Sequence, residues 1–128
     1  TKEERFEEWQ DFHKDLLEKF RADPNHYHLG IICSYGFMID SKIIDLFSHG
    51  VFVIHPSLLP LYRGATPIQS ALFNGDRETG ISLCEAIKEV FDAGRIWIQQ
   101  KVPIDQTDTY TTVGKTMSDR AAGLVDRL

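Results

Sequence analysis

Residues 51–67 have the sequence VFVIHPSLLPLYRGATP, an apolar run that leads into a proline-rich loop. The run Val51–Ile54 contains no polar residue, which is typical of a strand that is covered on both faces of a sheet. Gly50 precedes it, in a position that glycine commonly occupies just after a helix. The pattern predicts a buried strand that ends at His55, where the loop begins.

The residues before this strand predict a strand–helix–strand unit. Residues 27–34 (YHLGIICS) form a short apolar run, which indicates a second strand. Residues 42–48 predict a helix, because Asp40 or Ser41 can cap its start. Strands joined by a crossover helix lie parallel in one sheet, and ligands gather at their carboxyl ends. We therefore expect an α/β sheet with His55 at its ligand-binding edge.

The first segment predicts an amphipathic helix over residues 3–22. Its apolar side chains recur at helical spacing on a charged background. They are Phe6, Trp9, Phe12, Leu16, Leu17 and Phe20. Pro24 disfavours helical geometry in the residue before it, so the helix should end there. We expect His13 on the polar side of this helix.

The second half of the chain predicts two strands and two helices. A helix should open at Thr66-Pro67, with proline in its first turn. Alternating side chains predict strands over residues 80–86 and 95–102, joined as a hairpin or near-hairpin with residues 92–94 at its tip. Apolar residues at helical spacing predict a last helix that starts at Asp108 or Thr109 and runs towards Leu128.

Composition limits the classes of protein that this chain can represent. Its 128 residues, 42% of them hydrophobic, have the size of one domain. A net charge of −5 argues against a protein that coats a polyanion, although a local patch could still contact nucleic acid. No apolar stretch reaches the roughly 18 residues that span a bilayer. Cys33 and Cys84 lie in apolar runs without a CxxC pair, so we expect buried free thiols and no zinc site.

Residue chemistry singles out three candidates for a site. His55 could act near neutral pH as an acid, a base or a hydrogen-bond donor, or it could be a loop histidine that only contacts the backbone. Asp92, in the sequence Asp92-Ala93-Gly94, could orient an imidazole, or it could simply belong to a turn. Arg63 could bind a phosphate or a carboxylate, or only hold its loop in place.

Longer motifs carry a resemblance to a known family. Residues 55–69 (HPSLLPLYRGATPIQ) and 71–80 (ALFNGDRETG), with Ser34-Tyr35-Gly36 upstream and residues 92–94 downstream, closely resemble the folate-dependent formyltransferases. Within that family they are most similar to the branch that acts on methionyl-tRNA. The resemblance covers residues from about 27 to 128.

The resemblance implies a fold and a domain organisation. It implies an α/β, doubly wound and mostly parallel sheet, incomplete because it lacks its N-terminal strands. Residues 1–128 would form a single partial catalytic domain, with residues 1–24 as an amphipathic helix and residues 25–128 as the half that binds folate. A protein partner or a missing N-terminal segment would then cover the open sheet.

The resemblance also implies an activity and its residues. The family transfers the formyl group of 10-formyltetrahydrofolate, without a metal, to an amine, here that of methionyl-initiator tRNA. It uses an Asn, a His and an Asp, and His55 and Asp92 match the latter two. The residues that would contact the folate are Leu58, Leu59, Pro60, Arg63, Gly64 and Gly94. Initiator formylation implies a location in the mitochondrial matrix or the bacterial cytoplasm.

One departure from the family leaves the activity open. Val53 stands where the family has its Asn, and an isopropyl group donates no hydrogen bond to an oxyanion. Losing one such donor typically costs about 100- to 1,000-fold in rate. An alternative is therefore a catalytically inactive homologue that serves as a structural or assembly subunit, for example of a mitochondrial ribosomal complex. A nicotinamide-dependent oxidoreductase is disfavoured, because no Gly-x-Gly-x-x-Gly follows any predicted strand.

Overall fold

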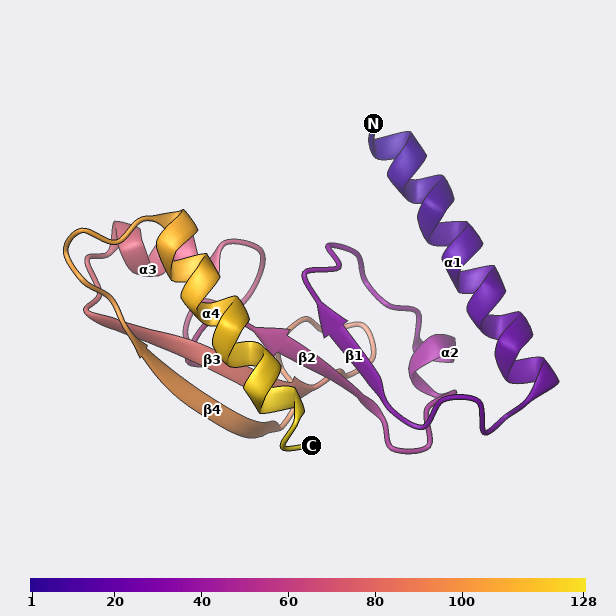
Figure 1. Ribbon diagram of the computed structural model, residues 1–128. Coiled ribbons are helices and arrows are strands. Elements are labelled where there is room, and N and C mark those ends of the chain that lie inside the picture. Colours follow the sequence, from indigo (N-terminus) through magenta and orange to yellow (C-terminus); the bar gives the residue numbers. More distant parts are fainter.

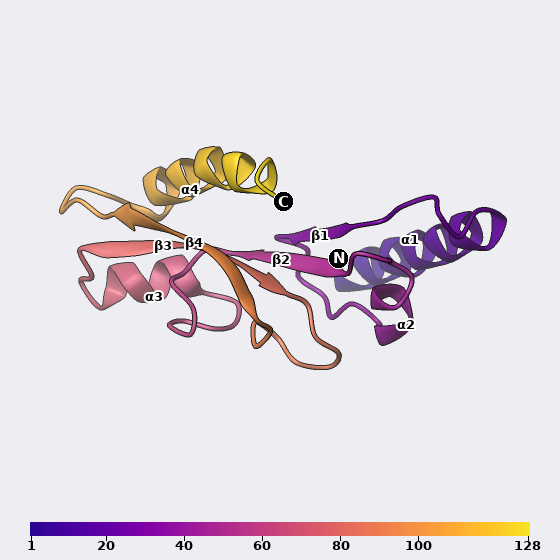
Figure 2. The ribbon, with the colours of Figure 1, turned by 90° about the horizontal axis from the view of Figure 1, so that it is seen from below.

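The computed structural model describes residues 1–128, which form four strands and four helices (Figure 1). In chain order these elements are α1 (Lys2–Ala22), β1 (Gly30–Cys33), α2 (Ser41–Ile44), β2 (Val51–His55), α3 (Pro67–Phe73), β3 (Glu78–Glu85), β4 (Ile96–Pro103) and α4 (Tyr110–Val125). The helices α1 and α2 lie on the β1 side of the molecule, and α3 and α4 lie beside β3 and β4 (Figure 2). No helix combines the length and apolarity needed to cross a bilayer.

The four strands form one open sheet in the order β1-β2-β3-β4. β1 and β2 are parallel, with Gly30 opposite Val51, which confirms the expected strand–helix–strand unit. β2 pairs antiparallel with β3, and β3 pairs antiparallel with β4. The α/β class is confirmed, but the pairing in this chain is mixed, and only one of the three strand pairs is parallel. A short connection between β3 and β4 can only join antiparallel neighbours, since a parallel pair needs a long crossover.

Two elements are shorter than their sequence patterns indicate. β1 begins at Gly30 rather than at residue 27, because only residues 30–33 pair with β2. α2 is a single turn rather than a helix over residues 42–48, although Asp40 caps it through a 2.8 Å hydrogen bond from the Lys42 amide. After this turn the chain continues in tighter bonds three residues apart, such as the Leu46 amide to the Ile43 carbonyl.

The apolar side chains form two separate cores. The larger core joins α3 and α4 to β3 and β4, and its buried members are Ile68, Ile81, Val102, Val113, Met117, Ala121 and Leu124. The smaller core joins α1 to α2 through Leu16, Phe20 and Ile43. The carboxyl-terminal half of α1 is therefore docked by its predicted apolar stripe. In the amino-terminal half, Phe6 and Phe12 keep 49% and 47% of their surface exposed.

Two sequence expectations about single side chains were wrong. His13 is buried with the apolar stripe of α1 rather than lying on its polar side, because it packs against Trp9 at 4.1 Å between ring centroids. Cys33 is exposed, because β1 is an edge strand with nothing beyond it, whereas Cys84 is buried in β3 as expected.

The burial of His13 predicts a pH dependence of stability. Burial lowers the pKa of His13 below its ordinary value of 6.5, and the nearby charge of Asp40 offsets part of this effect. The neutral imidazole therefore favours the folded state above the unfolded pKa, and this contribution is lost as the pH falls below about 6.5. Urea unfolding at about pH 7.5 and about pH 5.5 should show a larger loss of stability for the native chain than for His13→Gln. Equal losses would contradict this assignment.

The two cysteines should differ in reactivity. Burial raises the pKa of the Cys84 thiol to about 11, and the carboxylates of Asp92 and Glu85 add to this shift. Because the thiolate is the reactive species, iodoacetamide at neutral pH should alkylate Cys33 and leave Cys84 unmodified. Mass spectrometry of the native protein measures this, with the urea-unfolded chain as the control in which both thiols react. Comparable labelling of both sites in the native protein would show that β3 opens to solvent.

Candidate functional site

A cavity of about 470 Å³ lies at the carboxyl end of β2. Its walls come from the end of β1 and the loop after it, from β2, from the start of α3 and from residues 91–92. The titratable pair His55 and Asp92 faces this cavity from two segments that are distant in sequence. The structure thus brings together the two side chains that the sequence analysis put forward as catalytic.

Both ring nitrogens of His55 face oxygen atoms. Nε2 lies 2.8 Å from the carbonyl oxygen of Tyr62, and since a carbonyl can only accept, Nε2 donates this hydrogen bond. Nδ1 lies 3.4 Å from Oδ2 of Asp92. The side chains of His55 and Asp92 are only 6% and 8% exposed, so bulk water has little access to this contact. The imidazole is therefore fixed in orientation by one backbone oxygen and one carboxylate.

Asp92 joins two loops at this point. Its Oδ2 also accepts a 3.0 Å hydrogen bond from the amide of Gly64. Its backbone has a φ of 50°, a left-handed conformation that non-glycine residues adopt only where the surroundings enforce it. Ser34, which lines the cavity, and Tyr62 adopt similar values of 50° and 53°. Backbone strain of this kind is concentrated around His55.

Tyr62 holds the loop that follows His55. Its hydroxyl donates a 2.6 Å hydrogen bond to Oδ2 of Asp76 and accepts one of 2.9 Å from the side-chain amide of Asn74. The turn after α3 therefore anchors the phenol, and the anchored residue presents its carbonyl to His55. This explains in structural terms why the Asn74-Gly75-Asp76 motif accompanies the loop motif. Sequence reasoning missed Tyr62, because its contact with His55 is made by the backbone carbonyl, which every residue type has.

A buried polar network fixes the other end of the same loop. The hydroxyl of Ser82 in β3 donates to the carbonyl of Ser57 at 2.7 Å and accepts from the amide of Leu59 at 3.0 Å. Gln99 in β4 donates to the carbonyl of Leu59 at 2.8 Å. Ser57 itself donates to the carbonyl of Leu61, so its hydroxyl is committed to the loop. The sequence feature that could have indicated this network is Ser82, a polar residue in a strand whose residues 79–84 are all buried.

The residues that the resemblance assigns to folate binding are spread over several environments. Gly64 lines the cavity beside Asp92. Leu59 is buried under the loop, and Leu58 packs against Gly80, where an added Cβ would come within 2.3 Å of it. Pro60 and Arg63 are exposed and do not line the cavity. Their contacts with folate remain predictions.

Gly94 acts through backbone packing. An added Cβ there would lie 1.8 Å from the carbonyl oxygen of Glu85, so only glycine lets the chain pass this close to the end of β3. The amide of Glu85 also donates a 2.9 Å hydrogen bond to the carbonyl of Arg95. The close approach fixes where the segment carrying Asp92 leaves the sheet.

Val53 lines the cavity at the position where the resemblance expects an asparagine. It also lines a second, apolar hollow of about 60 Å³. That hollow shares Ile32, Phe37, Val53, Phe91 and Asp92 with the larger cavity, and its other walls are formed by Met38, Ile39, Ile44, Ala86, Ile87 and Val90. A polar compartment with His55 and Asp92 therefore adjoins an apolar one. No three His, Cys, Asp or Glu side chains come together in the geometry of a metal site.

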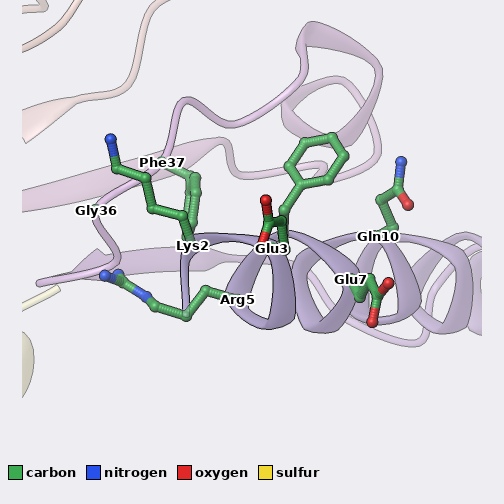
Figure 3. A pocket seen from close by; sticks show the side chains of 8 residues that line it. Lys2, Glu3, Arg5, Glu7, Gln10, Gly36 and Phe37 are labelled. Carbon is green, nitrogen blue, oxygen red and sulfur yellow. The ribbon is translucent and has the colours of Figure 1, made fainter.

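A larger hollow of about 590 Å³ lies along α1 and contains neither His55 nor Asp92 (Figure 3). Its walls are mainly charged side chains of the first turns of α1, together with Gly36 and Phe37. Because it lacks the buried titratable pair, we place the candidate active site in the smaller cavity. Gly36 and Phe37 line both, so the two spaces are neighbours.

Comparisons with known proteins find several methionyl-tRNA formyltransferases. Methionyl-tRNA formyltransferase of Thermotoga neapolitana is 43% identical over 95 residues, which cover 74% of this chain and 30% of that protein. The enzyme of the same name from Pseudothermotoga lettingae is 41% identical over 103 residues, covering 80% of this chain and 34% of that protein. The chain thus spans about a third of the length of these curated relatives.

Solved structures share the fold. Phosphoribosylglycinamide formyltransferase from Streptococcus pneumoniae superposes with a TM-score of 0.74 at 22% identity, over 90% of this chain and 62% of that chain. A formyltetrahydrofolate deformylase from Pseudomonas syringae gives a TM-score of 0.68 at 25% identity, over 81% of this chain and 35% of that chain. The family model described as formyl transferase matches residues 1–127. With that match over nearly its whole length, the chain belongs to the formyl transferase family.

Proposed function

We propose that this chain carries the donor side of a formyltransferase active site, with 10-formyltetrahydrofolate as the donor and the amino group of methionyl-initiator tRNA as the acceptor. The observation that carries the proposal is the contact between His55 and Asp92, 3.4 Å apart in a cavity at the end of β2. The names of the relatives support the acceptor, and the deformylase among the structural neighbours supports a folate donor.

The proposed reaction needs a hydrogen-bond donor but no cofactor chemistry from the protein. The amine nitrogen attacks the formyl carbon, and the electrons of the carbonyl bond move to oxygen. The oxyanion then re-forms the carbonyl, the bond between the formyl carbon and N10 of the folate breaks, and the proton lost by the amine ends on N10. An imidazole N–H beside the formyl oxygen stabilises the oxyanion, and Asp92 orients that imidazole.

In this structure His55 has no free N–H for the substrate. Nε2 donates to the Tyr62 carbonyl, and Nδ1 faces Asp92. If Asp92 keeps the ring in place, Nε2 must exchange the Tyr62 carbonyl for the formyl oxygen when the donor binds. The Tyr62 carbonyl oxygen thus occupies the position of the oxyanion until the formyl oxygen of the substrate replaces it. In our proposal, the apolar hollow beside Val53 holds part of the flat folate ring, since ten of its eleven lining residues are hydrophobic.

The alternative role, as an inactive structural or assembly subunit, is favoured by one feature. β1 is one of the two edge strands of the sheet, and Ile31 on it is 38% exposed, so a further strand or a partner would find an unpaired backbone there. We infer that such a segment covers this edge. The compartments that formylate initiator tRNA, the bacterial cytoplasm or the mitochondrial matrix, are where we expect the active protein to work.

Donor binding separates the two roles. Calorimetric titration of chain 1–128 with a non-reactive 10-formyltetrahydrofolate analogue should give measurable heat if the cavity is functional. Asp92→Asn should weaken this binding, because the neutral amide would no longer hold His55 by charge, whereas Phe73→Ala, at a side chain that is 93% exposed outside the cavity, should bind as the native chain does. Absence of heat from the native chain would favour the structural role.

Restoring the missing hydrogen-bond donor at position 53 should restore turnover. We expect chain 1–128 alone to formylate methionyl-tRNA no faster than background, and a chimaera that replaces the matching third of the Thermotoga neapolitana enzyme to be slow. Val53→Asn in that chimaera should raise the rate by about 100- to 1,000-fold, as one regained oxyanion donor would. Val53→Leu is the control, with no donor added. An unchanged rate in Val53→Asn would show that another group already supplies the hydrogen bond.

A further inference from the structure

Two neighbouring hollows border the amino-terminal half of α1. The first is the groove of about 590 Å³ already described, which we call the α1 groove and which includes Lys2, Arg5 and Gly36 (Figure 3). The second, of about 310 Å³, is lined by Arg5, Glu8, Trp9, Phe12, Tyr35 and Phe37, and we call it the aromatic box. Arg5 and Phe37 line both, with the guanidinium carbon 5.2 Å above the Phe37 ring.

Aromatic rings form most of the walls of the box. Trp9 and Phe37 have centroids 6.3 Å apart, and Phe12 and Tyr35 are 6.0 Å apart. Phe12 keeps 47% of its surface exposed. Rings that pack only on one side leave a face on which another planar group can stack.

Two polar atoms of the box have no partner. Nε1 of Trp9 and the hydroxyl of Tyr35 are buried, and neither makes a hydrogen bond. A buried donor left unpaired is costly, and such atoms in native structures call for an explanation. Burial also raises the pKa of Tyr35, so its phenol keeps its proton and remains a donor. Both residues line the same hollow, which also holds the carboxylate of Glu8 as an acceptor.

The two hollows carry both basic and acidic side chains, unlike a surface that binds polyanions. Lys2 and Arg5 extend along the α1 groove on the side of Gly36, and Nη2 of Arg5 lies 3.3 Å from the position of a Cβ at Gly36 (Figure 3). Glu3 and Glu7 line the same groove, so its formal charge is balanced. Such a surface can contact one phosphate but would not bind a long backbone by charge alone.

The box adjoins the candidate active site. Tyr35 and Phe37 line both the box and the cavity of His55. A ligand in the box would therefore lie directly behind the wall of the site at which the acceptor amine must arrive.

We propose that the aromatic box binds a nucleobase at the single-stranded end of the acceptor RNA. The base stacks on the rings of Phe12 and Phe37 and donates an exocyclic amine to Glu8. Because the donors of Trp9 and Tyr35 are buried and unpaired, a small rotation of these two side chains on binding presents them to ring nitrogens or carbonyl oxygens of the base. A neighbouring phosphate contacts Lys2 or Arg5. Stacking on aromatic rings with hydrogen bonds at the base edge is how proteins recognise unpaired RNA bases. This inference rests on the proposed function, because it deepens the choice of acceptor.

Trp9 provides the readout. The chain has two tryptophans, Trp9 and Trp97, so in Trp97→Phe the tryptophan fluorescence comes from Trp9 alone. Titration of this variant with adenosine 5′-monophosphate, and with a short single-stranded RNA ending in CCA, should give saturable quenching. Ribose 5-phosphate, which lacks the base, should give none. Raising the salt concentration should weaken binding only slightly, because stacking rather than charge carries it.

Two further variants test the named contacts. Glu8→Gln and Tyr35→Phe, each combined with Trp97→Phe, should weaken binding of the nucleotide by about 5- to 10-fold, as expected for the loss of one hydrogen bond to a buried partner. Phe73→Ala in the same background is the control for an exposed aromatic side chain elsewhere. Circular dichroism would verify that each variant remains folded.

The outcomes separate this inference from the proposed function. Quenching that does not saturate, or equal affinity in all the variants, would overturn the nucleobase site. Quenching by ribose 5-phosphate equal to that by the nucleotide would overturn it too, because the groove would then bind phosphate alone. The donor-analogue titration uses neither base nor RNA, so heat from the donor without nucleotide binding would refute only the box. If the nucleotide binds but the formyl-donor analogue gives no heat, the nucleobase site is supported and the proposed transferase role is refuted.

Discussion

The orientation of His55 depends on the position of one loop carbonyl. The Tyr62 oxygen accepts from Nε2, and the phenol of the same residue is held by Asn74 and Asp76 beyond α3. From the other side, Asp92 contacts Nδ1 and ties itself to Gly64 in the same loop. The loop, the turn after α3 and the segment after β3 thus meet at one imidazole. Hydrogen bonds hold each of them in register with the others, in addition to the packing of Leu58, Leu59 and Gly94.

This dependence explains why the site lies where the regular elements end. The larger core fixes β3, β4, α3 and α4, and Ser82 and Gln99 transmit that rigidity to the loop through buried hydrogen bonds. Buried polar networks of this kind specify one arrangement, because a displaced loop would leave their donors unpaired. The left-handed backbone at Tyr62 and Asp92 is tolerated because the hydrogen bonds that these two residues make fix their positions.

The sequence predicted the larger elements well and the contacts between loops poorly. Periodicity located α1 and α4, and an unbroken apolar run located β2, since burial on both faces leaves a clear pattern. The motifs also indicated that His55 and Asp92 belong together, although their catalytic roles remain predictions. The extent of α2, the burial of His13 and the exposure of Cys33 were missed. These depend on which neighbour covers a residue, and local spacing does not carry that information.

The division of the apolar side chains into two cores has a mechanical consequence. The α1–α2 core and the α3–α4 core share no buried side chain, and the β1–β2 ladder is the regular structure that bridges them. The cavity of His55 draws its walls from both sides of that bridge. A small rotation of one half against the other would therefore widen or narrow the entrance while each core stays intact.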